Sequence, residues 1–338
     1  MPLVKFNQAM ERSIGAARNR RILDLRLQHL LASLLFATVF VNSFLAIFGV
    51  DFWLDLKAYE ANVFNVRYYE IQLQSASSIG DYLTLEPLWY YLLEFLLSLG
   101  IPVLGAFKII SILSCTTISY FLLRQTNNYL ILLLLINPIF IDLVIGQLRS
   151  AVSLALLLTG FTFRRETARI AFFIAATLVH TSGALFAALY FGYLVVMKYE
   201  FVGAIKFRKA FWIAIAIGLS ILYELTRQIF LTVLDDRRAE TLLDYESGAL
   251  FGIGWLSFVA SHFALDTRKT VNFPFAFYVI NAMFFLGSAF SGSYASRYIA
   301  VAYPMLLLMW SNLRGVPQVL FTAHWFLFTL IYASLWLP

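Results

Sequence analysis

Residues 30–49 read LLASLLFATVFVNSFLAIFG, a run of twenty residues without a charged side chain. About 20 apolar residues in a helix cross the ~30 Å hydrocarbon core of a bilayer. No small-residue cleavage site follows the run, so it is interpreted as a retained first helix rather than a signal peptide. The composition of the whole chain also indicates a membrane protein, because 61% of its 338 residues are hydrophobic and 13% are charged, with a mean hydropathy of +0.78. Soluble domains have about 25% charged residues. The composition predicts an all-α polytopic membrane protein and excludes an ordinary soluble enzyme.

Apolar runs continue to the C-terminus and divide the chain into candidate membrane-spanning segments. Their ranges are 30–49, 86–99, 103–123, 128–146, 147–163, 168–180, 182–197, 208–230, 249–265, 271–290, 297–313 and 316–336. If each segment up to residue 163 crossed once, the basic stretch 164–169 (RRETAR) would lie outside, against its charge. One segment therefore does not cross, and we expect about 11 (10–12) transmembrane helices in one integral membrane domain, 1–338.

Two segments are candidates for the one that does not cross. The first is 128–146, because Asn137–Pro138 interrupts its helical pattern and Asp142 follows. Proline removes a backbone donor, and irregular backbone persists at membrane depth only inside protein or beside water. The second is 86–99, which is short and contains Glu94.

Loop charges set the predicted orientation. The leader 1–28 has six basic and two acidic residues, a net charge of +4. Segment 50–86 has two basic and six acidic residues (−4), and segment 231–248 has two basic and five acidic residues (−3). Because positive loops stay cytoplasmic, the leader is predicted to be cytoplasmic and both acidic loops external. The formal charge of +6 therefore reflects topology, and a nucleic-acid partner is excluded.

This topology places three basic side chains near one external face. Segment 168–197 fits a hairpin of two short helices whose tip lies near His180, while Arg149 follows segment 128–146 and Arg297 follows a polar turn. Charged groups at membrane depth are costly and are usually functional or paired. Together the three suit a diphosphate-linked substrate. The alternatives are that each arginine is an interfacial anchor and that His180 is a turn residue bonded to a neighbouring hydroxyl.

Acidic residues support two other hypotheses. Asp51 and Asp55 follow the first helix, where lipid-linked single-sugar transferases often carry a catalytic carboxylate. An ion path through a flippase, a transport protein that catalyses no covalent reaction, could be lined by Glu94, Lys108 and Asp142. The chain has no HExxH motif, no His pair at i,i+4 spacing, no nucleotide-binding glycine loop and a single cysteine. We therefore expect no metal and no cofactor, and the sugar donor must arrive already activated.

Several short motifs occur along the chain in the same order as in a known protein family. They are D-x3-Y at Asp55–Tyr59, EPLWYY from Glu86, QLRSAVSLAL around Arg149, LVHTSGALF around His180, Tyr245 in the second acidic loop, and SRYIAVAY at Arg297–Tyr298. In this order, from the first loop to about residue 310, they resemble the EpsG-like and Wzy-type polysaccharide polymerases. One departure is Arg149–Ser150–Ala151, where the family usually has Arg-Gln-Gly; Gln147 lies two residues earlier.

The resemblance implies a GT-C-like bundle with broken or re-entrant helices in a bacterial inner membrane. It also implies that undecaprenyl-diphosphate-linked oligosaccharides serve as donor and acceptor on the periplasmic face. The growing chain would leave its lipid carrier and join a new lipid-linked repeat unit, giving O-antigen or exopolysaccharide. Membrane lipid and a chain-length regulator protein are the further partners. The related O-antigen ligases use arginine and histidine residues in the same way, so a ligase remains an alternative function.

The roles expected of the three basic residues in the transfer reaction follow from their charge and chemistry. Arg149 and Arg297 would hold the donor diphosphate, because guanidinium groups carry a permanent charge and forked donors. His180 would assist deprotonation of the acceptor hydroxyl. The residues expected to bind substrate are Asp55, Tyr59, Glu86, Tyr245 and Tyr298.

Overall fold

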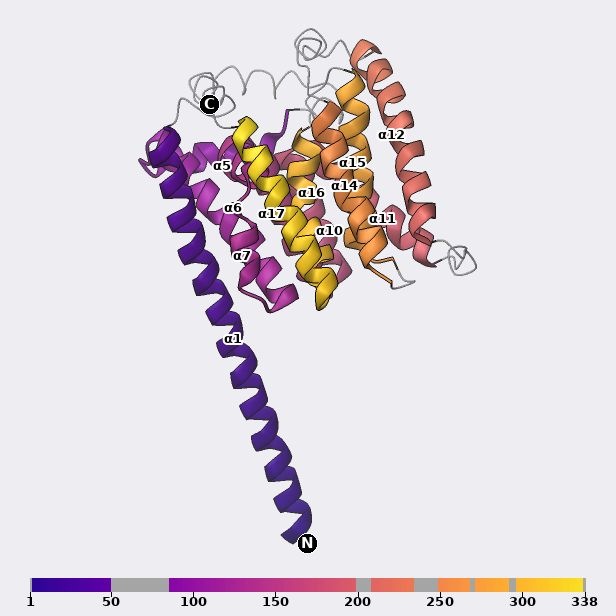
Figure 1. Ribbon diagram of the computed structural model, residues 1–338. Helices are drawn as coiled ribbons and strands as arrows, with labels where there is room; N and C mark the ends of the chain where they lie inside the picture. The colour runs from indigo at the N-terminus through magenta and orange to yellow at the C-terminus, as the bar shows by residue number, and fades with distance from the viewer. Residues whose placement is uncertain are drawn as a thin grey trace.

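The computed structural model describes residues 2–49, 85–198, 208–233, 249–267, 271–291 and 296–336, and within these ranges the regular structure is helical throughout. Figure 1 shows the helices side by side in one bundle, with α1 along one edge and α12 along the other. The helices are α1 (Pro2–Phe48), α5 (Pro87–Ser98), α6 (Val103–Thr126), α7 (Leu130–Leu134), α8 (Pro138–Ile141), the π-helix η1 (Asp142–Gly146), α9 (Leu148–Thr162), α10 (Glu166–Val179), α11 (Ser182–Lys198), α12 (Arg208–Val233), α14 (Ala249–Leu265), α15 (Phe273–Ser291), α16 (Ser296–Ser311) and α17 (Val316–Trp336).

Four stretches of helix are long and apolar enough to cross a membrane. They are Leu23–Phe48, Val103–Thr126, Lys209–Thr226 and Val316–Leu335, and a fifth is obtained if the bent pair Pro138–Gly146 and Leu148–Thr162 counts as one span. Several shorter apolar helices pack beside them. The structure therefore supports a helical, multi-pass membrane protein, while the expected number of about 11 crossings stays a prediction.

The N-terminal helix is longer than the sequence reading expected. A basic leader at 1–28 was expected to precede a separate helix at 30–49, whereas α1 is one continuous helix from Pro2 to Phe48. Figure 1 shows α1 extending beyond the bundle toward the N-terminus. Its apolar part, Leu23–Phe48, is the part long enough to span, and it packs against α6.

The predicted break at Asn137–Pro138 is confirmed. Helix α7 ends at Leu134, α8 begins at Pro138, and the segment Pro138–Gly146 is bent by 99° from α9. The Asn137 side chain caps α8 by accepting from the amide of Ile139 (3.0 Å). A helix that is interrupted among apolar side chains leaves backbone groups that need partners.

Helices α16 and α17 supply further partners for this break. The Tyr303 hydroxyl donates to the carbonyl of Leu134, and the Trp325 indole donates to the Tyr303 oxygen (2.7 Å). The Asn137 amide donates to the Thr329 hydroxyl (2.8 Å). The irregular backbone is therefore held by side chains from the far end of the chain.

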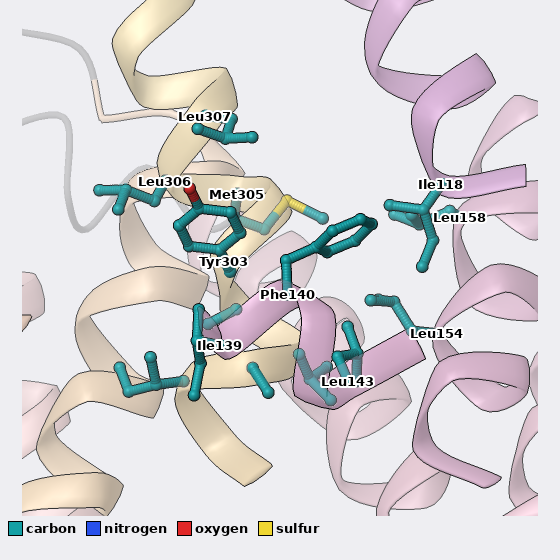
Figure 2. Close-up of a cluster of buried hydrophobic side chains, with 14 of the residues drawn as sticks. Ile118, Ile139, Phe140, Leu143, Leu154, Leu158, Tyr303, Met305, Leu306 and Leu307 are labelled. Carbon is teal, nitrogen blue, oxygen red and sulfur yellow. The ribbon is translucent and has the colours of Figure 1, made fainter. Parts of the chain in front are cut away.

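The broken segment also lies at the centre of the core. Figure 2 shows Phe140 among side chains of α6, α9 and α16, with Ile118 and Leu158 on one side and Tyr303 on the other. Phe140 is fully buried, and its ring lies 6.4 Å from that of Tyr303 and 5.9 Å from that of Phe40. Dense packing of this kind resists rearrangement, so the start of α9 has a fixed position.

The predicted hairpin at 168–197 is confirmed. Helix α10 ends at Val179 and α11 begins at Ser182, which places the tip at His180–Thr181. The two helices approach closely at Gly183, where an added Cβ atom would lie 2.7 Å from the Ala176 carbonyl group. The Ser153 hydroxyl of α9 donates to the same carbonyl oxygen (3.0 Å), so α9, α10 and α11 are joined just beside His180.

Candidate functional site

The site begins at Glu86, the residue before α5. Its backbone is left-handed (φ 53°, ψ 53°), and Pro87 occupies the first turn of α5. Helix α5 has 12 residues and a rise of about 18 Å, too short for a ~30 Å hydrocarbon core. Glu86 is 1% exposed. A carboxylate removed from water needs cationic or hydrogen-bonding partners.

Those partners come from two distant parts of the chain. The Arg149 guanidinium, through Nη1, donates to Glu86 Oε2, and His180 Nδ1 contacts Oε1. Thr181 donates to the same Oε1 with its backbone amide (3.2 Å) and its hydroxyl (3.4 Å). We call Glu86, Arg149, His180 and Thr181 the Glu86 cluster. It joins the start of α5, the start of α9 and the tip of the α10–α11 hairpin.

Exposure rises outward through the Glu86 cluster. The exposed fraction of the side chain is 1% for Glu86, 10% for His180 and 25% for Arg149. The carboxylate is therefore the buried support, and the arginine and histidine lie between it and the surface. An adjacent arginine favours the ionised form of a carboxylate, so Glu86 balances part of the positive charge of the cluster.

Arg297 completes the set of basic residues expected from the sequence. It lies in the first turn of α16, close enough to His180 for its charge to act on the imidazole. The structure thus brings Arg149, His180 and Arg297 into one neighbourhood, as the sequence reading expected. Their roles in binding and catalysis stay predictions.

The expected substrate-binding residues have different outcomes. Tyr298 follows Arg297 but faces elsewhere, because its hydroxyl bonds to that of Tyr223 on α12 and its ring packs 5.7 Å from Phe284 on α15. Glu86 was expected to touch substrate, yet its carboxylate is buried against Arg149 and His180. Asp55, Tyr59 and Tyr245, with Asp51, lie outside the described residues.

Neither the central position of Glu86 nor the contribution of Thr181 is evident from the sequence alone. A carboxylate next to an apolar helix was the available signal for Glu86, because such groups in a membrane protein are usually paired. For Thr181 the signal was weaker, since hydroxyl residues are common at turns.

The three residues of the expected ion path differ in their surroundings. Glu94 and Lys108 are exposed on its outside, while Asp142 accepts a hydrogen bond from the Gln147 amide (2.6 Å) within the broken segment. Lys108 borders a pocket whose other lining is mainly apolar, including Leu45 and Ile145. The flippase hypothesis therefore stays untested.

Metal binding has no obvious site in the part of the chain that the structure describes, because no group of three or more His, Cys, Asp or Glu side chains gathers there. Comparison of the chain with protein-family models, characterised proteins and solved structures finds no match. The arguments for function therefore rest on the residues and their geometry.

Proposed function

We propose that the chain is a membrane glycosyltransferase that polymerises oligosaccharide repeat units carried on a polyprenyl diphosphate, undecaprenyl diphosphate in bacteria. One observation carries the proposal: a buried carboxylate, Glu86, holds a histidine and an arginine from distant segments side by side. A second arginine, Arg297 at the start of α16, lies near the same histidine. Such a set combines a titratable base with two permanent cations, which suits transfer from a diphosphate leaving group.

The proposed reaction is a direct group transfer. A hydroxyl oxygen of the lipid-linked acceptor sugar attacks the anomeric carbon at the reducing end of the growing chain. A new carbon–oxygen bond forms there as the bond to the donor diphosphate breaks, and the electron pair of that bond leaves with the diphosphate. The acceptor proton passes to His180. The products are a chain longer by one repeat on the acceptor carrier and a free polyprenyl diphosphate.

Glu86 is a positioning residue in this proposal. Its carboxylate accepts at the Nδ1 side of His180, which favours the tautomer with the proton on Nδ1 and leaves Nε2 to accept the substrate proton. Thr181 binds the same carboxylate oxygen and so helps to fix the carboxylate. A base held at the right angle contributes roughly 10²–10⁴ in rate.

The two arginines neutralise the leaving group. The Arg149 side chain is more exposed than those of Glu86 and His180, and its planar guanidinium can form parallel hydrogen bonds with phosphate oxygens. Arg297 approaches the same histidine from α16. Two arginines offset much of the negative charge that develops on the diphosphate as the glycosidic bond breaks.

The experiment is a deletion of the gene followed by analysis of lipid-linked glycans. The proposal expects single repeat units on their carrier at the external face, and restoration of long chains by the wild-type gene. Full-length polymer left on the carrier would indicate a ligase, incomplete repeat units a single-sugar transferase, and repeats confined to the cytoplasmic face a flippase. Any of these three results contradicts the proposal.

A further inference from the structure

A second polar site lies at the other end of α16. An open pocket of about 490 Å³ is formed by the C-terminal ends of α14 and α16 and the start of α17. We call it the Arg314 pocket. Between Arg297 and Ser311, α16 rises about 21 Å, so the pocket and the Glu86 cluster lie near opposite ends of the bundle.

Three side chains with hydrogen-bond donors line this pocket and have no partner among the residues that the structure describes. The side chains of Thr267, Asn312 and Arg314 border it, and none of them forms a hydrogen bond or an ion pair with any residue in the described ranges. Arg314 is exposed. A hydroxyl, an amide and a guanidinium are together suited to a ligand with several acceptor oxygens.

The carboxylate that lines the pocket is already balanced. Asp266 is buried, and its Oδ2 lies 3.4 Å from Nζ of Lys209 and 3.2 Å from Nε2 of His262. Lys209 also donates to the backbone carbonyl of Asp266. The charge left facing the pocket is that of Arg314, so an anion is attracted rather than repelled.

We infer that the Arg314 pocket binds the phosphate of an anionic phospholipid headgroup. The pocket lies where helices end, the level at which headgroups meet a membrane protein. Its apolar lining, Leu265, Leu313 and Pro317, suits the glycerol and the first acyl carbons. By sequence, the segment 266–269 (DTRK) has two basic residues and one acidic residue, and this net charge of +1 predicts the cytoplasmic side. Basic pockets between helices on that side bind anionic lipid headgroups.

Lipid binding to the purified, full-length chain tests this inference without any activity assay. In a neutral detergent, native mass spectrometry measures the fraction of protein that carries cardiolipin, phosphatidylglycerol or phosphatidylcholine. We expect the two anionic lipids to bind in preference to phosphatidylcholine. Arg314→Ala should weaken cardiolipin binding about tenfold, the loss of one charge-assisted contact. The matched control is Arg124→Ala, because Arg124 is an exposed arginine in the last turn of α6; it should bind cardiolipin within twofold of wild type.

Several results would overturn the inference. Equal cardiolipin binding by wild type and Arg314→Ala is one, and equal losses in both arginine variants are another. Displacement of the lipid by inorganic phosphate at the same concentration would indicate a site for free phosphate instead. If Arg314→Ala does not fold, Asn312→Leu serves as the second variant, with a several-fold loss expected. The outcome does not depend on the proposed polymerase activity.

Discussion

Two trios in this molecule each combine a carboxylate, a histidine and an arginine or lysine, in different surroundings. Glu86 has a histidine and an arginine beside it, and Asp266 has a histidine and a lysine. In the second trio His262 and Asp266 lie four residues apart at the end of α14, and the His262 side chain is 2% exposed. In the first trio His180 comes from another segment and is 10% exposed, beside an arginine at 25%.

This difference separates a site from a structural contact. A carboxylate, a histidine and a cation are not enough for catalysis, because the base must reach a substrate hydroxyl. The Asp266 trio ties the end of α14 to the start of α12 and leaves its histidine enclosed. In the Glu86 cluster the arginine and histidine side chains are 25% and 10% exposed, against 1% for the carboxylate side chain.

The largest expected effect comes from changing the two histidines in parallel. His180→Gln keeps a donor for Glu86 but removes the base, so we expect a loss of polymer of roughly 10²-fold or more. His262→Gln should leave chain length unchanged. Gel analysis of glycans from complemented deletion strains checks both, with membrane protein levels as the control. Equal effects of the two substitutions would remove the distinction between the trios.

The next largest effect concerns the two carboxylates. Glu86→Gln and Asp266→Asn each leave a cation without its counter-charge, and truncating one partner of a buried charge pair costs about 2–5 kcal/mol. We expect a lower unfolding temperature in both variants but a loss of polymer only in Glu86→Gln at matched protein levels. Normal chain length with Glu86→Gln would contradict the positioning role.

Substitution by lysine sharpens the comparison for the arginines. Arg149→Lys and Arg297→Lys keep the charge and lose the planar fork, so both should give chains of intermediate length or shorter. Lys209→Arg, at the other trio, should retain normal length. An interfacial anchor tolerates lysine, because lysine snorkels as well as arginine. Full-length polymer from both lysine variants would therefore assign the two arginines to anchoring.

The smallest effect is a packing effect at the hairpin that carries His180. In Gly183→Ala the added methyl meets the Ala176 backbone at 2.7 Å, and overpacking costs about 1–3 kcal/mol. Gly192→Ala in the same helix is the matched control, since nothing lies within 4 Å of its added carbon. Thermal unfolding in detergent should show a lower midpoint for Gly183→Ala alone. Equal midpoints would argue against the close approach of α10 and α11.

Much of the helical layout was predictable because apolar runs and their interruptions are local properties. The expected segments 249–265 and 316–336 coincide with α14 and α17. The break at Asn137–Pro138 was predictable because proline acts on its own backbone neighbours. The hairpin tip at 180–183 followed from the short distance between two basic loops.

The partners of Glu86 were not predictable in this way. Arg149 is 63 residues away in sequence and His180 is 94 residues away, so their contacts depend on how α5 packs beside α10. Charge bias placed Arg149, His180 and Arg297 on one face and gave no information on a buried carboxylate among them. The contact of the Tyr298 hydroxyl with Tyr223 on α12 was not predictable either, and the role of Tyr298 in substrate binding stays a prediction.

We propose that the Glu86 cluster carries out chain elongation. The most direct measurement uses lipid-linked repeat units extracted from the deletion strain and incubated with purified wild type, His180→Gln or His262→Gln. The account predicts longer lipid-linked chains from wild type and from His262→Gln, and unchanged single repeats with His180→Gln. Equal elongation by His180→Gln and wild type, or no elongation by wild-type protein, would contradict it.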